Sequence, residues 1–134
     1  MKKEKFASYV GTRKKSIARA MIKEGKGVIR FNKKLLGNIS PAMARMKIEE
    51  PLIISGDAWQ KYDIDVSVFG GGVISQAEAA RLAIAKALAS KDPALKDEFL
   101  RYDRTLLVAD VRQRETRKPN RGGNARGKIQ KSYR

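Results

Sequence analysis

Residues 62–89, YDIDVSVFGGGVISQAEAARLAIAKALA, decide the fold because they combine a strand, a turn and a helix. Ile64, Val66 and Val68 alternate with polar residues, which is the period of two expected of a strand with one buried face. Three consecutive glycines follow, at Gly70, Gly71 and Gly72. Because glycine adopts backbone angles that other residues avoid, the chain is predicted to change direction sharply after the strand.

The helix after the glycines is predicted to begin at a capping box and to carry one apolar stripe. Ser75 and Glu78 have the S-x-x-E spacing of that box. The stripe consists of Ala77, Ala80, Ile84, Ala87 and Leu88. Because alanine is small, this helix is expected to lie very close to the sheet that it covers.

The glycine turn admits more than one interpretation. A glycine-rich turn before a helix N-terminus is a common way to hold phosphate. The turn lacks the G-K-[ST] ending of a P-loop and the spacing of a dinucleotide fingerprint. A purely structural turn is therefore favoured, a phosphate contact is the alternative, and a nucleotide-binding catalytic loop is the least favoured interpretation.

The formal net charge of +16 is concentrated at the two ends of the chain. Residues 1–34 hold 12 Lys+Arg and 2 Asp+Glu, whereas residues 35–111 hold 9 and 11. Residues 112–134 hold 9 and 1. Solvated protein surfaces usually mix the two signs, so such unbalanced ends indicate a polyanionic partner. Nucleic acid fits better than an anionic membrane, because neither end has the apolar face of a membrane-binding helix.

Composition excludes several other classes of function. The chain has no cysteine and no histidine, which removes disulfides, thiolate and imidazole metal sites, and the usual nucleophile–base pairs. No apolar run approaches the ~20 residues needed to span a bilayer. The N-terminal residues lack the apolar core of a signal peptide. We therefore expect a soluble intracellular protein that uses no cofactor.

Elements outside the central stretch are expected on both sides of it. A hairpin is predicted from residues 16–23 and 28–31, because KEGKG between them reads as a turn. Ser40–Pro41 predicts a helix over residues 42–49, which Pro51 limits, and Asp92–Pro93 predicts another over residues 93–101. The remaining expectations are a strand at residues 6–10, a basic loop at 11–15 and a strand at 105–108.

Two domains of different character follow from these patterns. Residues 1–111 are expected to form a globular α+β domain. Residues 112–134 contain a proline, three glycines and almost no apolar side chain. Such a segment buries too little surface to offset its ordering entropy, so an extended basic tail is predicted.

Paired carboxylates and one tryptophan are the remaining candidates for chemistry. Asp63 and Asp65 share one face of the central strand and lie ~7 Å apart, a spacing that suits Mg²⁺ or acid–base work. No base accompanies them, so ion pairs with neighbouring basic strands are the favoured interpretation. Trp59 is expected to pack in the core or a hinge rather than to stack on a base.

Several spaced motifs resemble the S-nine family of small-subunit ribosomal proteins, in its archaeal and eukaryotic branch. They are GTRKKSIARA at residues 11–20, DIDVSVFGGGVISQAEAARLAIAKAL at 63–88, DPALK at 92–96, DVRQRETRK at 110–118 and the terminal ARGKIQKSYR. The resemblance covers nearly the whole chain and keeps the order of the motifs. It implies a small mixed sheet packed by helices, with a left-handed βαβ crossover.

The resemblance also implies a function and its partners. Members of the family are non-enzymatic constituents of the small ribosomal subunit in the cytoplasm. They bind the rRNA of the subunit head beside other head proteins, and they send the C-terminal tail to the peptidyl-site tRNA. By that likeness no membrane partner and no homo-oligomer are expected.

Site residues follow from the resemblance position by position. The residues expected to meet rRNA are Arg13, Lys14, Lys15, Arg19, Gly70, Gly71, Gly72, Arg112, Arg114, Arg117, Lys118, Arg121, Arg126 and Lys128. Those expected to contact or neighbour tRNA are Lys131, Tyr133 and Arg134. Two other classes stay open: a free nucleic-acid-compacting protein, and a small phosphotransferase that uses the glycine turn.

Overall fold

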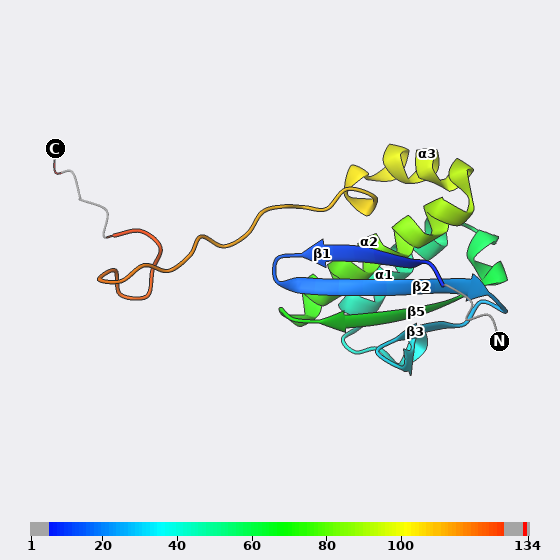
Figure 1. The fold of residues 1–134 in the computed structure, drawn as a ribbon, viewed down its shortest axis with the longest axis horizontal. Coiled ribbons are helices and arrows are strands. Elements are labelled where there is room, and N and C mark those ends of the chain that lie inside the picture. The colour runs from blue at the N-terminus through cyan, green and yellow to red at the C-terminus, as the bar shows by residue number, and fades with distance from the viewer. Residues whose placement is uncertain (1–5, 128–132, 134) are drawn as a thin grey trace.

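A computed structural model describes residues 6–127 and residue 133. The chain forms a sheet on which helices pack, followed by a long tail (Figure 1). The strands are β1 (Ser8–Arg13), β2 (Ser16–Glu24), β3 (Ile29–Phe31), β4 (Lys34–Leu35) and β5 (Tyr62–Phe69). The helices are α1 (Ala42–Ile54), α2 (Val73–Lys91) and α3 (Pro93–Tyr102), with short 3₁₀-helices at Leu36–Asn38, Ala58–Lys61 and Arg104–Leu106. The α+β class predicted from the sequence is confirmed.

The five strands form one mixed sheet in the order β1-β2-β5-β3-β4. Every neighbouring pair is antiparallel except β3 and β5, which are parallel. In the central β2–β5 pair, Ala18 lies opposite Val68 and Ala20 opposite Val66. All four side chains are buried, so the period of two in β5 corresponds to one buried face, as predicted.

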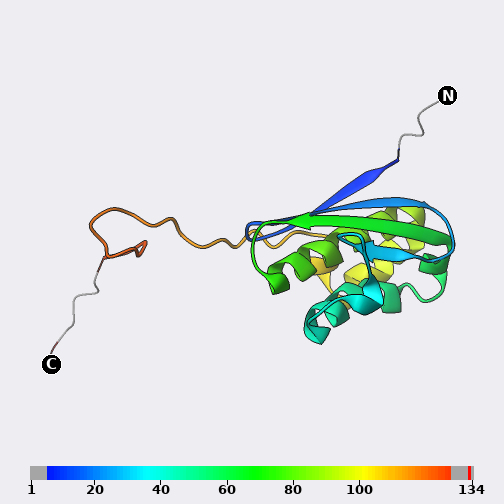
Figure 2. The same cartoon turned by 90° about the horizontal axis from the view of Figure 1, so that it is seen from below.

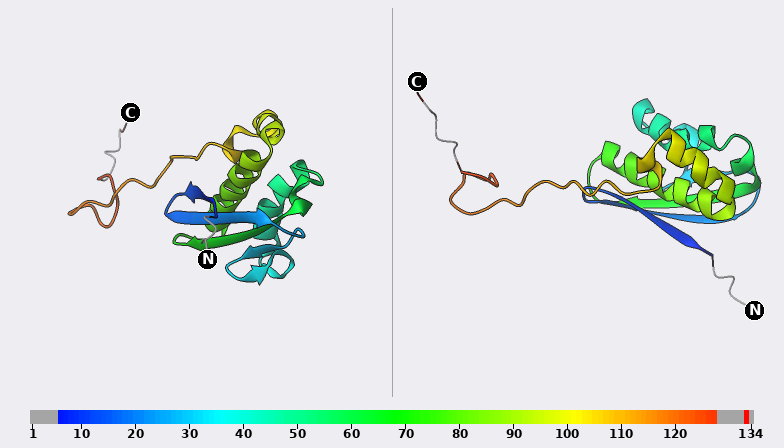
Figure 3. Two further views of the ribbon diagram at one scale, coloured as in Figure 1. Left: turned by 45° about the vertical axis from the view of Figure 1, so that its right-hand side comes forward. Right: turned by 90° about the horizontal axis from the view of Figure 1, so that it is seen from above.

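The helices cover one face of the sheet and leave the other face open (Figure 2). Figure 3 shows the same separation from two further directions. The unit β3–α1–β5 joins two adjacent parallel strands. With the helices towards the viewer and these strands pointing upward, β5 lies to the left of β3, so the crossover is left-handed (Figures 1 and 2). Right-handed crossovers make up ~98% of such connections, so period and propensity alone would not predict this one.

Helix α2 lies against the sheet at very short range, as its alanines predict. Ala77, Ala80, Ala83 and Ala87 are at most 1% exposed. A Cβ placed on Gly11 of β1 would lie 2.7 Å from the backbone nitrogen of Ala83. Strand and helix backbones therefore come as close as the absence of a side chain at position 11 allows.

The predicted hairpin between residues 16–23 and 28–31 is wrong. Strand β3 pairs with β5 in parallel, and β5 lies between β2 and β3. The Asp63 carboxylate accepts hydrogen bonds of 2.9 Å from the backbone N–H groups of Lys26 and Val28. These bonds tie the turn after β2 to β5, which then receives β3 as its other neighbour.

The predicted boundaries at the N-terminal strand and the C-terminal strand are also wrong. Strand β1 runs to Arg13, and only Lys14 and Lys15 form the loop before β2. Residues 105–108 form no strand, because Asp103 accepts a 2.9 Å hydrogen bond from the Thr105 N–H and starts a 3₁₀-helix there. That short helix buries Leu106 completely.

Helix starts and ends depart from the predicted caps at three places. Pro41 itself occupies the N-cap position of α1, so Ser40 makes no side-chain cap. Helix α1 continues through Pro51 to Ile54, and the burial of Pro51 holds this last part against the core. Helix α2 begins at Val73, so the predicted box of Ser75 and Glu78 is wrong: Ser75 is the third helical residue, and its hydroxyl accepts a 3.0 Å hydrogen bond from the N–H of the N-cap residue Gly72. The Asp92 cap of α3 is confirmed by its 3.1 Å hydrogen bond from Ala94 N–H.

Residues 112–127 contain no helix or strand and run away from the domain (Figure 1). Every residue from 112 to 124 is exposed. The separation of the chain at residue 111 remains a prediction, because short-range contacts still join residues 110 and 112 to the domain.

Candidate nucleic-acid interface

Two of the motifs singled out in the sequence lie side by side at one end of the sheet. Ser16, directly after the Lys14–Lys15 turn, donates a 2.9 Å hydrogen bond from its hydroxyl to the carbonyl of Gly70. The same hydroxyl lies 2.8 Å from that of Ser75 on α2. The basic turn and the glycine turn are therefore held together by a buried serine.

The first two glycines have structural reasons to be glycine. Gly70 and Gly71 have φ angles of +78° and +65°, in the left-handed region that strains other residues. A Cβ on Gly70 would also lie 2.5 Å from the Lys15 carbonyl oxygen, and one on Gly71 would meet the Ser16 and Ser75 hydroxyls. Both facts support the structural turn that the sequence favours. Contact of these glycines with rRNA remains a prediction.

A groove of about 660 Å³ opens beside these two turns. It is bounded by the basic turn, the glycine turn, the first residues of α2 and the start of the tail. Lys14, Lys15 and Arg114 supply positive charge to its lining, and Val73 and Ile74 supply apolar surface. The structure thus brings together basic residues from both ends of the chain.

Arg13 is placed differently from its basic neighbours. Its guanidinium donates a 2.9 Å hydrogen bond to the Glu78 carboxylate and a 3.3 Å bond to the carbonyl of Arg112. It also lies 3.7 Å from the Asp110 carboxylate, and its side chain is only 17% exposed. Arg13 therefore joins β1, α2 and the root of the tail, and little of its side chain is exposed to an external phosphate.

The root of the tail carries a second set of charged contacts. Asp110 accepts hydrogen bonds from the side chain and the backbone N–H of Arg112. These bonds hold the pKa of the Asp110 carboxyl well below its usual range, the side-chain bond being the larger cause. The charged form of Asp110 therefore stays available to Arg13 and Arg112 across physiological pH.

A further cluster joins the three helices behind the groove. Arg81 of α2 donates hydrogen bonds to Glu50 of α1, and to Asp103 and Thr105 at the end of α3, the last two at 3.1 and 3.2 Å. The hydrogen bond from the Thr105 N–H is the largest influence on the pKa of Asp103, and it lowers that pKa. Desolvation comes next and opposes it, but the net shift of the pKa is downward. No pattern along the sequence marks these partners, because each pair is separated by more than twenty residues.

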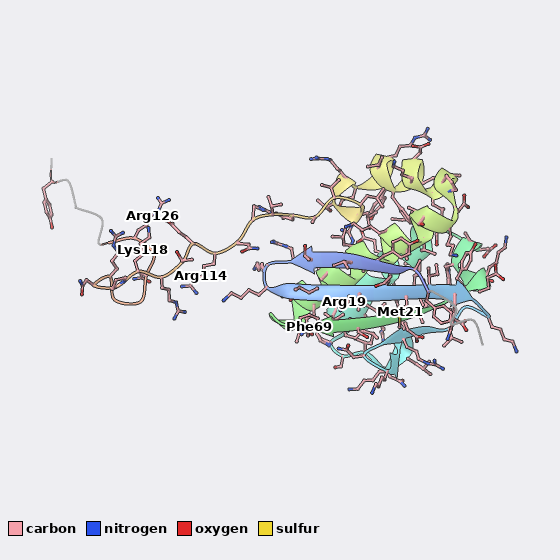
Figure 4. The ribbon with its side chains drawn as sticks, in the orientation of Figure 1. Arg19, Met21, Phe69, Arg114, Lys118 and Arg126 are labelled. Atoms are coloured by element: carbon pink, nitrogen blue, oxygen red, sulfur yellow. The ribbon has the colours of Figure 1, made fainter. Side chains whose placement is uncertain are left out.

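The predicted basic residues of the tail that the structure describes, from Arg112 to Arg126, are all exposed. Arg126 and Lys118 lie 3.1 and 3.7 Å from Glu115, the one acidic residue of the tail. Backbone hydrogen bonds from Lys118 N–H to Asn124 and from Asn124 N–H to Arg121 close a loop there. Figure 4 labels Arg114, Lys118 and Arg126 along this part of the tail, away from the domain. Within the described residues, Arg114, Arg117 and Arg121 have no carboxylate within 4 Å.

The residues expected at tRNA are mostly outside the described part of the chain. Lys131 and Arg134 lie outside the described residues, as does Lys128 from the rRNA set. Tyr133 is described and is 89% exposed. The assignment of these residues to tRNA stays a prediction.

The paired carboxylates of β5 have separate structural roles. Asp65 lies 3.7 Å from both Lys23 and Arg30, which confirms the predicted ion pairs with neighbouring strands. Asp63 instead accepts the hydrogen bonds from the turn N–H groups described above. These bonds lower the pKa of Asp63, the bond from Val28 most and the bond from Lys26 next. Among the described residues, no three His, Cys, Asp or Glu side chains are grouped to hold a metal ion.

Sequence reasoning did not single out the apolar residues on the open face of the sheet. Phe69 is 53% exposed and Met21 is 46% exposed. The available signal was their place in the period of two, because both occupy strand positions that alternate with buried residues. An apolar side chain at such a position is on the solvent side.

The fold and these surfaces define a class of basic proteins in which an α+β domain carries basic turns and a basic tail, as suits a polyanionic partner. The particular relationship comes from comparison with known families. Residues 11–134 match the family described as "Ribosomal protein S9/S16", and the chain belongs to that family.

Known relatives agree with this family assignment. "Small ribosomal subunit protein uS9" of Methanothrix thermoacetophila is 50% identical over 132 residues, which cover 97% of this chain and 99% of the relative. The protein of the same name in Methanococcus maripaludis strain C7 is 47% identical over 133 residues, with the same coverage. Strain C5 of that species has an equally similar protein. The resemblance to the archaeal branch of the S-nine family is thereby confirmed.

Membership of this family fixes the coarse function. The chain is a structural, non-enzymatic constituent of the small ribosomal subunit, and it works in the cytoplasm with rRNA and other ribosomal proteins. The phosphotransferase hypothesis is therefore excluded by the family. In the described residues, no helix is both long and apolar enough to span a membrane.

Proposed function

We propose that the α+β domain anchors the chain on rRNA of the subunit head, and that the tail reaches tRNA held in the peptidyl site. The observation that carries the proposal is the distribution of charge. Lys14, Lys15 and the described basic residues of the tail are exposed, whereas residues 35–111, which supply most of the core, are near neutral. Exposed Arg and Lys residues among glycines suit phosphate contacts, which give affinity and position rather than sequence readout.

The domain and the tail have different parts in RNA binding under this proposal. The Lys14–Lys15 turn is fixed by β1 and β2, so it presents its charges from a rigid base. The tail is an exposed segment without helix or strand, and its arginines are open to solvent (Figure 4). A thin basic segment enters the crevices of a large folded RNA that would exclude a globular domain. Its approach to tRNA follows the behaviour implied by the family resemblance.

The tail assignment is tested with small subunits assembled from a chain that lacks residues 131–134. We expect these subunits to form normally, because the domain and most tail arginines are retained. Their retention of tRNA in the peptidyl site should fall, and the matched control Lys96→Ala on α3 should leave it unchanged. Equal tRNA retention by truncated and full-length subunits would refute the assignment of the tail to tRNA.

The rRNA assignment is tested by salt dependence of binding. Replacing Lys14 and Lys15 by alanine should weaken binding to small-subunit rRNA. The slope of log affinity against log salt should flatten by ~0.7–0.9 for each phosphate that the variant no longer neutralises. An unaltered slope would remove this turn from the interface. Arg13 is left intact in this experiment because it holds the root of the tail.

A further inference from the structure

The sheet face opposite the helices is uncovered along β1, β2 and β5 (Figures 2 and 3). Several side chains that point outward from this face are large, apolar and exposed to solvent. Phe69 is 53% exposed, Met21 46% and Val10 43%. Exposed apolar side chains scattered singly need no explanation, but here they lie on neighbouring strands of one flat surface.

The strand register places these residues in adjacent rows. Thr12, Ile17 and Phe69 form one row across β1, β2 and β5. The next row is Val10, Arg19 and Ser67. Adjacent strands lie ~4.8 Å apart and diagonal neighbours ~7–8 Å, so Arg19 lies within reach of the Phe69 ring. Figure 4 shows both residues on the sheet, with Arg19 near the middle of β2.

Positive charge at the end of the face where Phe69 lies has no acidic partner on the described part of the face. Among the described residues, no carboxylate lies within 4 Å of Arg19, and its cross-strand partners Val10 and Ser67 are neutral. The Lys14–Lys15 turn adjoins the same end, since the Lys15 carbonyl touches the glycine after Phe69. At the other end, Asp65 lies 3.7 Å from both Lys23 and Arg30 and offsets part of their charge.

We propose that the Phe69 end of the open sheet face binds an unpaired segment of rRNA. In this arrangement Phe69 stacks on a base, with Ile17 beside it, and Arg19 and the Lys14–Lys15 turn meet the flanking phosphates. The proposal rests on the proposed function, namely that the domain binds rRNA, and it assigns the kind of RNA and the side chains that hold it.

Chemistry favours unpaired RNA over a duplex or a protein partner. Double-stranded RNA presents a phosphate backbone and a shallow groove, to which an exposed phenyl ring adds little. An unstacked base gains from an aromatic ring and from a guanidinium next to it. A sheet that displays an aromatic residue among basic ones has both features. An acidic protein segment would match the charge but would make no use of the ring.

The variant Phe69→Thr tests the stacking role, because threonine suits a strand and position 69 is half exposed. Leu35→Thr is the matched control: Leu35 is 52% exposed on β4, at the far edge of the sheet. Thermal unfolding of both variants checks that they fold. Binding to small-subunit rRNA is then measured over a range of salt concentrations, together with chemical probing of unpaired bases in the complex.

Loss of one stacked base corresponds to a ~5- to 150-fold loss of affinity. We expect Phe69→Thr to show a loss in this range with an unchanged salt slope, and to expose one or a few bases to the probe. Arg19→Gln should weaken binding and flatten the slope by ~0.7. Leu35→Thr should behave as the wild type.

Two results would overturn this site while leaving the proposed function standing. The first is that the Phe69→Thr variant binds rRNA with wild-type affinity and protects the same bases as the wild type. The second is that the Phe69→Thr variant binds rRNA normally but no longer binds a neighbouring ribosomal protein, which would assign the face to a protein partner. Failure of the wild-type chain to bind rRNA at all would instead refute the proposed function.

Discussion

Substitution of Gly11 by alanine should strongly destabilise the fold, because β1 and α2 touch at that residue. The added Cβ would lie 2.7 Å from the Ala83 nitrogen and closer still to the Ala79 carbonyl oxygen. Both partners are backbone atoms of a helix, so no side chain can rotate away. Ordinary carbon contacts begin near ~3.5 Å. The nitrogen contact alone therefore requires strand and helix to separate by about 0.8 Å, and the closer carbonyl oxygen requires more.

The magnitude follows from what that separation does to the packing. A radial gap of ~0.5–1 Å already forfeits a quarter to a half of each dispersion contact. The alanines of α2 are fully buried against the sheet and have no longer side chains with which to fill the gap. Overpacking costs ~1–3 kcal/mol in most cores. Because the clash involves backbone on both sides, we expect about 3 kcal/mol, and roughly 10 °C in Tm for a domain of this size.

Urea unfolding of the full-length chain measures this directly. Gly37→Ala is the matched control, since a Cβ at that position meets nothing within 4 Å. The control should remain within ~1 kcal/mol of the wild type, on the stabilising side where the backbone angles suit alanine. A Gly11→Ala variant as stable as the control would show that α2 does not rest on β1 as described.

Three further substitutions have expected outcomes. Asp63→Asn removes a carboxylate whose pKa is lowered by N–H groups of the turn, Val28 first and then Lys26. Since the lowered folded pKa adds stability above the unfolded value of ~3.9, the wild type should exceed the variant at pH 7, and the gap should close below about pH 4. A gap that stays constant from pH 7 to pH 3 in urea titrations would contradict this role. Arg13→Gln should speed tryptic cleavage after Arg112, whereas Lys14→Gln should not, and equal rates would mean that Arg13 does not hold the tail root. Arg81→Met should lower the free energy of unfolding by about 2 kcal/mol, because it leaves partly buried carboxylates on Glu50 and Asp103 without their partner. The exposed Arg101→Met should change it by less than ~0.5 kcal/mol, and a similar effect of both variants would refute the importance of the cluster.

Local patterns were enough to predict the central elements. The alternation in β5 and the alanine stripe of α2 are signals contained within each element, and both match the structure. Asp92 caps α3 because the cap and its helix are adjacent in sequence. The left-handed crossover came only from the family resemblance, since nothing in a period or a propensity distinguishes the two hands.

Interactions between distant parts of the chain account for the failures. The turn after β2 reads as a hairpin locally, but Asp63 captures its N–H groups from 35 or more residues away. Pro51 ends a helix by local rules, yet its burial keeps it inside α1. Distant contacts also add roles that the sequence does not show: Arg13, whose contact with rRNA stays a prediction, faces Glu78 and Asp110 in the fold. Which basic residues stay free for RNA therefore depends on tertiary placement of the acidic ones.

The most direct test of the central claim is a crosslink from the end of the tail to tRNA. The chain has no cysteine, so Tyr133→Cys gives a unique attachment point for a photoreactive group, at an exposed residue. Small subunits that carry this variant are irradiated with and without tRNA in the peptidyl site. The proposed function predicts crosslinks to the anticodon stem-loop of the bound tRNA, and the same group at Lys96→Cys on α3 should give none. Crosslinks from position 133 to rRNA or protein alone, with the peptidyl site filled, would contradict it.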